Sequence, residues 1–318
     1  MGDFSSPAAK EQALKAARAA AKAEHWSIAA SQFEAVYAEE QTPELNRELV
    51  DSLYHNEQYL RAEQYAAEMD AAYLSSQADF NLRLVVALKN RQFIFAREFC
   101  ALSAAADWRD QGLSQIIQAE DESRTTLATT QRLLAKQFAH LGDVSFGEQR
   151  QRLEQARQLP LKEFMQSVQY LLVDPFLHPL IRATLLEELL RLRVKATVKL
   201  QWLDEQMYTI DTADLQPVNA SRAAAGIRSY FQEDLGQRDP MMAANAQQTV
   251  TLQLMMLYPF IDKVVTQPTS WARLVAGEDL PPEVTADEKN DMIAWQQRLN
   301  RFMAELFGPL NGENAEKP

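Results

Sequence analysis

Three short stretches of one pattern decide the fold of this chain: WSIA at residues 26–29, YLRA at residues 59–62 and FIFA at residues 93–96. Each begins with an aromatic residue and ends, three positions later, with an alanine. The alanines, Ala29, Ala62 and Ala96, are therefore almost evenly spaced along the chain. A small residue fixed at a period of about 34 residues is typical of solenoids built from helix-turn-helix units. The methyl group is needed because two helices cross so closely there that a larger side chain would strain them.

The pattern resembles tetratricopeptide repeats, in which an alanine of the second helix is followed four residues later by a phenylalanine. Ala29 and Phe33 match that spacing, and Ala66 and Cys100 take the phenylalanine position in the later units. The first-helix positions expected to be apolar or small are so with one exception, Arg83. The resemblance covers residues 8–107 and implies a right-handed stack of three antiparallel helix pairs. The alternative is an ordinary helical bundle whose aromatic and alanine residues line a core.

Beyond these repeats the chain is predicted to be mostly helical. We expect a long helical connector over residues 108–142, a helical domain over 143–308 and a frayed polar tail over 309–318. The helices of the domain are expected at 146–159, 161–173, 178–194, 218–236, 240–265 and 286–307. Alternating apolar residues predict a β-hairpin near 196–211. The predicted fold class is all-α, a tetratricopeptide-like solenoid followed by a mostly helical domain with one small β-hairpin.

Two segments of this second region carry a further resemblance. Asp174–Leu180 (DPFLHPL), the leucine-rich stretch after it and Val198–Trp202 (VKLQW) resemble the carboxyl-terminal portion of tetratricopeptide-repeat proteins of lactic acid bacteria and bacilli. The resemblance implies a recurring architecture of repeats followed by a helical domain with a hairpin. It implies no activity, cofactor or catalytic residue.

Composition narrows the classes of function. Only 9 of 318 residues are glycine, which disfavours glycine-rich phosphate loops. A net charge of −12 disfavours binding to nucleic acid, which depends on lysine and arginine. The single cysteine, Cys100, is expected to be a buried apolar residue in a reducing compartment. The sequence has no apolar run long enough to cross a membrane and no secretory signal, so we expect a cytoplasmic protein without a membrane partner.

Catalytic and metal-binding signals are weak. The histidines His25, His55, His140 and His178 show no metal-ligand spacing, so no metal or cofactor is expected. The adjacent carboxylates Glu39–Glu40 and Glu187–Glu188 point in different directions on a helix and are better explained as solvated faces. No nucleophile elbow or phosphate loop is visible. We therefore expect a protein that is not an enzyme, while an active site in the second region stays an alternative.

Binding of a protein or peptide is the predicted function. In the tetratricopeptide family the groove is lined by fixed positions of each first helix, and the resemblance carries that role onto Arg18, Lys22, Arg47, Asp51, Tyr54, His55, Asn81 and Lys89. The basic members would suit a peptide with carboxylates, although all could be ordinary solvated residues. A second alternative is self-association into a homo-oligomer through Trp202 and Tyr208 or through the pairs Met241–Met242 and Met255–Met256.

Overall fold

The computed structural model describes residues 7–306, which fall into two compact units. The first unit runs to Arg132 and includes Arg157–Leu161, and the second comprises Leu133–Ala156 and the chain from Lys162 onward. The predicted fold class is confirmed, because the described residues are mostly α-helical and their only sheet is a two-stranded antiparallel hairpin. The predicted tail at 309–318 lies outside the described residues.

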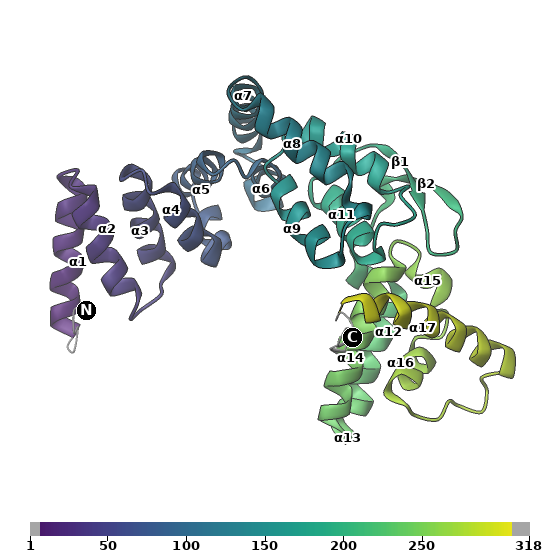
Figure 1. Cartoon of the computed structure of the whole chain (residues 1–318). Helices are drawn as coiled ribbons and strands as arrows, with labels where there is room; N and C mark the ends of the chain where they lie inside the picture. The colour runs from purple at the N-terminus through teal and green to yellow at the C-terminus, as the bar shows by residue number, and fades with distance from the viewer. Residues whose placement is uncertain (1–6, 307–318) are drawn as a thin grey trace, which may run out of the picture. The chain divides into compact units, whose positions relative to one another are not determined.

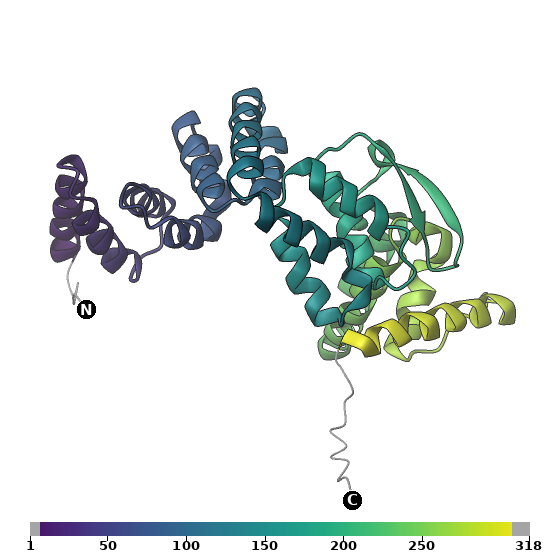
Figure 2. The same cartoon turned by 45° about the horizontal axis from the view of Figure 1, so that its top comes forward.

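In the first unit, successive helices pack against one another in chain order (Figures 1 and 2). The helices are α1 (Pro7–Lys22), α2 (Trp26–Tyr37), α3 (Pro43–His55), α4 (Tyr59–Ala66), α5 (Gln77–Lys89), α6 (Phe93–Ala101) and α7 (Arg109–Thr126). The short 3₁₀ helices η1 (Ala67–Leu74) and η2 (Ser103–Ala105) follow α4 and α6. The helices thus form the pairs α1–α2, α3–α4 and α5–α6, with α7 packed against the last of them.

The turns inside the three pairs have the same backbone geometry. Their central residues, Glu24, Glu57 and Arg91, have left-handed φ angles of 59°, 59° and 58°. In each turn the next amide donates to the carbonyl five residues earlier at 2.9 Å, as from His25 N to Ala20 O. This is the Schellman arrangement that ends many helices. Each left-handed residue stands five positions before the alanine of its pair, so the backbone repeats with the period of the alanines.

The residues that define the period are core residues. Ala29, Ala62 and Ala96 are completely buried. Cys100 is buried as predicted, and its burial raises the pKa of the thiol to about 11. Gly112 of α7 lies against it, because a Cβ added there would stand 2.7 Å from Cys100 Sγ. A glycine is therefore what allows α7 to approach the third pair.

Arg83, the exception in the apolar pattern, is also buried, with a relative exposure of 1%. Its guanidinium donates two 2.8 Å hydrogen bonds to the carboxylate of Glu63 and one of 2.7 Å to Asp70 Oδ1. It lies 4.1 Å from the centre of the Phe95 ring. A charge can occupy this core position because it is neutralised and hydrogen-bonded within the repeats.

The helices that follow α7 vary more in length, from 3 residues in α13 to 21 in α17. They are α8 (Ala128–Ala139), α9 (Phe146–Ala156), α10 (Leu161–Leu171), α11 (Pro179–Arg191), α12 (Arg222–Tyr230), α13 (Gly236–Arg238), α14 (Pro240–Leu257), α15 (Ile261–Val264), α16 (Pro268–Ala276) and α17 (Ala286–Leu306). Short 3₁₀ turns lie at Leu141–Asp143 (η3), Thr212–Asp214 (η4) and Val218–Ala220 (η5), and a π-helical turn η6 (Phe231–Leu235) joins α12 to α13. No helix within residues 7–306 combines the length and apolar composition needed to cross a membrane.

Two helix predictions in this region were wrong in detail. The helix expected at 240–265 is divided into α14 and α15, because Pro259 supplies no amide hydrogen and breaks the helical ladder. The sequence analysis also missed α16, which begins at Pro268 and buries Trp271 completely. The indole Nε1 of Trp271 donates to Gln253 Oε1 of α14 at 2.8 Å, so a contact between helices fixes α16.

The predicted β-hairpin is present as β1 (Thr197–Gln201) and β2 (Met207–Asp211), with Val198 opposite Ile210. Its apolar face is buried, and Gln201 N donates to Leu172 O at the end of α10 at 2.9 Å. The hairpin turn contains no glycine. Instead Glu205 takes a left-handed φ of 65°.

Candidate functional site

The eight predicted groove residues lie on α1, α3 and α5, but two of them bind the next helix pair. Arg18 Nε donates to Glu48 Oε1 on α3 at 2.6 Å. Arg47 Nε lies 3.2 Å from Asp79 Oδ1 on α5, and its Nη1 donates to Ala72 O at 3.1 Å. These arginines link successive pairs, so their charges are already matched by carboxylates.

Three other predicted residues form a row. Lys22, His55 and Lys89 are the last residues of α1, α3 and α5, they are exposed, and each stands two positions before the left-handed residue of its turn. We call these three residues the basic row. A basic residue at a helix C-terminus is favourable by itself, because it faces the negative end of the helix dipole.

Aromatic side chains connect two members of this row, His55 and Lys89. The Trp26 ring stacks on His55 at a centroid distance of 4.4 Å, and Tyr54 meets His55 edge-on at 5.3 Å. Tyr54 also contacts Tyr59 at 5.7 Å, and Lys89 Nζ lies 5.3 Å from the centre of the Tyr59 ring. We call Trp26, Tyr54, His55, Tyr59 and Lys89 the aromatic ladder. It crosses all three helix pairs without a break.

Tyr54, His55 and Lys89 of the ladder were predicted from the sequence as groove residues. Trp26 and Tyr59 were not, although both mark the repeat. Both begin the second helix of their pair, directly after the turn, which brings them beside the last residues of the first helices. That position in every unit was a signal that could have identified them.

The remaining predicted residues differ in environment. Asp51 is half-buried beside the row, with Oδ1 3.5 Å from His55 Nε2, and burial raises the pKa of its carboxyl while His55 opposes the shift. Asn81 of α5 is half-buried, and its Oδ1 accepts no hydrogen bond from the described residues. Lys22 makes no ion pair within residues 7–306. Since the Asn81 oxygen is itself buried, the surface offers ammonium donors and partly exposed rings.

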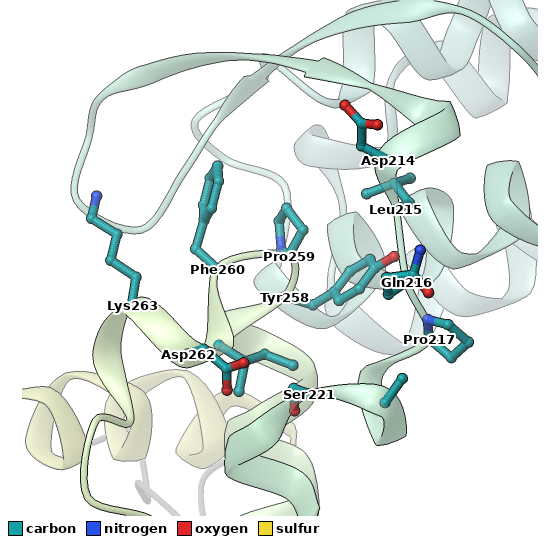
Figure 3. A pocket seen from close by; sticks show the side chains of 12 residues that line it. Asp214, Leu215, Gln216, Pro217, Ser221, Tyr258, Pro259, Phe260, Asp262 and Lys263 are labelled. Carbon is teal, nitrogen blue, oxygen red and sulfur yellow. The ribbon is translucent and has the colours of Figure 1, made fainter.

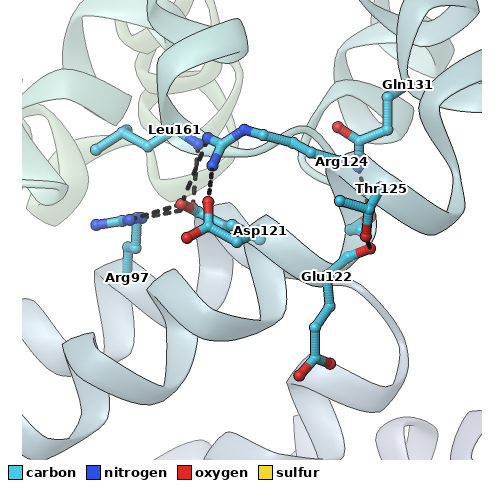
Figure 4. Close-up of polar contacts among 9 residues, drawn as sticks. Arg97, Asp121, Glu122, Arg124, Thr125, Gln131 and Leu161 are labelled. Atoms are coloured by element: carbon cyan, nitrogen blue, oxygen red, sulfur yellow. Dashed lines mark hydrogen bonds and ion pairs between the residues drawn. The ribbon is translucent and has the colours of Figure 1, made fainter.

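A buried polar network closes the other end of this unit (Figure 4). Glu120 of α7 accepts two 2.8 Å hydrogen bonds from Arg97 of α6 and one of 3.1 Å from Leu161 N. Arg157 forms an ion pair with Glu98, and its carbonyl accepts from Ile94 N at 3.1 Å. The buried carboxylate is satisfied by these donors, so the network holds residues 157–161 against α6 and α7.

In the second unit, a cavity of about 370 Å³ lies beside the loop between α14 and α15 (Figure 3). Asp262 accepts from the amides of Arg222 and Ala223 at 3.1 and 2.8 Å, which caps α12. Ser221 Oγ accepts from Ala224 N at 3.1 Å, and Lys263 Nζ donates to Tyr208 Oη at 2.6 Å. These polar groups hold α12 and the hairpin and are not arranged as a nucleophile with its base.

Acidic, histidine and cysteine side chains do not gather into a metal site in the described part of the chain, where no three of them lie close enough to hold an ion. Comparisons with known proteins give no match to a protein-family model, to a curated protein or to a solved structure. The site must therefore be interpreted from its own chemistry.

Proposed function

We propose that this protein is a non-catalytic scaffold of the tetratricopeptide kind, which binds an extended, acidic segment of a partner protein along the aromatic ladder. The observation that carries the proposal is the continuity of the ladder, whose ring and cation contacts pass through α2, α3, α4 and α5. An ordinary solvated helix face does not need half-exposed rings at the same place in successive units.

The chemistry of this surface selects the partner. Partly exposed aromatic rings give large apolar contact area at a small cost in side-chain entropy. Lys89 ends the ladder at α5, and Lys22 of the basic row ends α1 in the first helix pair, so both exposed ammonium groups can donate to carboxylates. An extended segment with acidic residues on both sides of an apolar or aromatic residue matches this order. No cofactor, metal ion or nucleic acid is part of the proposal, and a cytoplasmic location fits the one buried cysteine.

Selection from a library of random peptides tests the proposal without knowledge of the natural partner. We expect the full chain to enrich acidic peptides that contain an apolar or aromatic residue. The double variant Lys22→Gln, Lys89→Gln should bind the enriched peptides about tenfold more weakly, because it removes two charge-assisted contacts. Fluorescence anisotropy of one labelled peptide measures this change.

The matched control is Lys15→Gln, Arg61→Gln, which also removes two exposed positive charges from the helix pairs but none from the ladder or the basic row. It should bind like the unaltered chain. If both double variants weaken binding equally, net charge explains the effect and the ladder is not the site. Enrichment of basic peptides, or of none, would also contradict the proposal.

Self-association is the second candidate, and one observation favours it. Met241 is 77% exposed and lines a surface hollow with Met242 and Val275, whereas Trp202 and Met256, which were also considered for such a contact, are buried. Methionine pairs of this kind suit an adaptable apolar contact between copies. Sedimentation over a concentration series would show a shift to dimer that Met241→Lys abolishes, and a monomer at all concentrations would remove the candidate.

A further inference from the structure

A second cavity in the carboxyl-terminal unit has an unusual set of polar groups. Its volume is about 460 Å³, and it lies between the segment before α11, the hairpin turn and α17. Its walls are partly apolar, and its polar lining contains two arginines and a single acidic residue. Its lining includes Leu177, Arg182, Trp202, Glu205, Arg298 and Phe302.

Arg182 is a buried cation without an ion-pair partner among the described residues. Its relative exposure is 7%, and Nη2 donates to the carbonyls of Asp174 at 2.8 Å and Leu177 at 3.1 Å. Its Nε is buried and has no acceptor within residues 7–306. Burial lowers the pKa of Arg182 to about 10 although the charge of Asp174 opposes the shift, so the group remains charged near neutral pH. A buried charge of this kind normally has an anion in direct contact, and Asp174 forms no ion pair with it.

Trp202 also lines this cavity and carries a second unsatisfied donor. The residue is 3% exposed, and its indole Nε1 is buried with no acceptor in the described part of the chain. Its ring is held by edge-on contacts with Tyr208 and Phe260. Because the unpaired groups of Arg182 and Trp202 are both donors, the missing partner is an acceptor.

Arg298 of α17 supplies a second positive charge at the cavity. Its Nη2 lies 3.6 Å from Glu205 Oε1, which is longer than a hydrogen bond. The Glu205 side chain is 84% exposed, and an exposed pair of this length contributes little to stability. Another oxyanion could therefore replace Glu205 at small cost.

We propose that this cavity binds the oxyanion group, carboxylate or phosphate, of a small molecule between Arg182 and Arg298, with Trp202 Nε1 as a further donor. The cavity is large enough to enclose the group together with a short apolar body against Leu177 and Phe302. The site is independent of the aromatic ladder, since all its residues belong to the second unit.

Calorimetric titration of the full chain with inorganic phosphate and, separately, with succinate tests the site and distinguishes its two possible ligand sources. Binding of one anion and not the other identifies the chemical class, and sodium chloride at equal ionic strength controls for screening. Arg298→Gln should weaken the binding by about tenfold, because a charge-assisted contact is lost. Glu205→Gln should strengthen it by about threefold, because the competing carboxylate is removed. A gain in affinity cannot come from a misfolded variant.

The nuclear magnetic resonance signal of the Trp202 indole N–H group provides a second measurement. We expect it to shift on addition of the binding anion, and Trp202→Phe should keep the ring while weakening the binding. Arg238→Gln is the matched control, because Arg238 also pairs with an exposed carboxylate, that of Asp234, in this unit but does not line the cavity. Absence of binding by both anions, or an affinity that Arg298→Gln and Glu205→Gln leave unchanged, would overturn the proposal.

Discussion

The two units use the same device to end helices, but only the first repeats it at a fixed interval. In the second unit, Arg193 and Gly277 have left-handed φ angles of 51° and 76°. As in the helix pairs, the next amide closes each turn: Val194 N donates to Leu189 O at 3.2 Å, and Glu278 N donates to Arg273 O at 2.9 Å. These two turns share no period with the others. A Schellman turn is thus a common local solution, and it becomes a repeat only where core residues recur with it.

The range of contacts also separates the units. Hydrogen bonds between neighbouring helix pairs join residues about one repeat apart, such as Arg18 to Glu48 at a separation of 30 and Gln77 to Gln111 at 34. In the second unit, His178 Nε2 donates to Phe302 O across 124 residues. Stability of the first unit should therefore depend on neighbour-to-neighbour interfaces, and that of the second on contacts that form only when the whole unit folds.

The largest expected effect on stability comes from removal of Arg83, the buried charge of the helix pairs. Arg83→Ala should lower the free energy of unfolding of the first unit by about 3–5 kcal/mol, because Glu63 and Asp70 lose their partner and a core volume is emptied. Chemical denaturation followed by circular dichroism, with hydrogen exchange to locate the loss, measures it. Protection should fall in α3 to α6 and remain in α11.

Arg61→Ala is the control for this prediction. Arg61 also pairs with a glutamate of a neighbouring helix, Glu34, but the pair is exposed, so its loss should cost less than about 1 kcal/mol. Equal costs for the two variants would show that Arg83 is not a structural centre of the repeats.

A smaller effect is expected at the alanine of the second pair. Ala62→Leu should cost about 1–3 kcal/mol, because the completely buried methyl group leaves no room for a larger side chain. Ala67→Leu, just beyond the end of α4 and exposed, should be nearly neutral. Thermal unfolding of both variants compares them, and a tolerated Ala62→Leu would mean that the close helix crossing has been misassigned.

The period could be derived from the sequence because the same packing problem recurs in each pair. Alanine spacing gave the core positions, and the alternating residues from Val198 onward gave the hairpin. Helix α16 could not be predicted, because its main anchor is the contact between Trp271 and Gln253 on another helix. The links of the aromatic ladder between helix pairs are likewise contacts in space, as between Trp26 and His55.

Two arginines interrupt apolar patterns of the sequence, and this signal was not used to predict their partners. Arg83 interrupts a predicted core position, and Arg182 lies within the apolar stretch PLIRATLLEELL at residues 179–190. Both are buried, the first in ion pairs with two carboxylates and the second without an ion pair among the described residues, although the charge of Asp174 acts on it. A charged residue inside an apolar pattern predicts a specific anionic partner, although the sequence does not show whether the protein supplies it.

Acid should affect the second unit through His178. Its Nδ1 accepts from Leu180 N at 3.2 Å, so the neutral ring caps α11. Desolvation by burial lowers the pKa of His178. The Phe302 carbonyl and Glu305 oppose this shift, and Arg182 adds to it. The unfolded chain then binds this proton more readily than the folded one. Stability is constant above the unfolded pKa of about 6.5 and falls below it, by at most about 1.4 kcal/mol per pH unit.

Hydrogen exchange of α11 at about pH 7.5 and about pH 5.5 measures this loss. His178→Asn keeps a capping acceptor without a titrating ring and should remove most of the pH dependence in that interval. His140→Asn, which changes an exposed histidine of the same unit, should retain it. An unchanged pH dependence in His178→Asn would assign the effect to other groups.

The smallest expected effect on stability concerns the left-handed turns that occur in both units. In the second unit a glycine, Gly277, occupies the left-handed position of its turn, whereas the helix pairs have Glu24, Glu57 and Arg91 at this position. A residue with a Cβ is strained in the left-handed conformation. Glu57→Gly should therefore stabilise the first unit by about 0.5–1 kcal/mol. Glu57→Ala separates backbone from charge, because it removes the carboxylate and keeps the Cβ, and it should give no comparable gain. If both substitutions stabilise equally in denaturant titrations, the charge of Glu57 opposes the fold and the strain of the repeated turn does not.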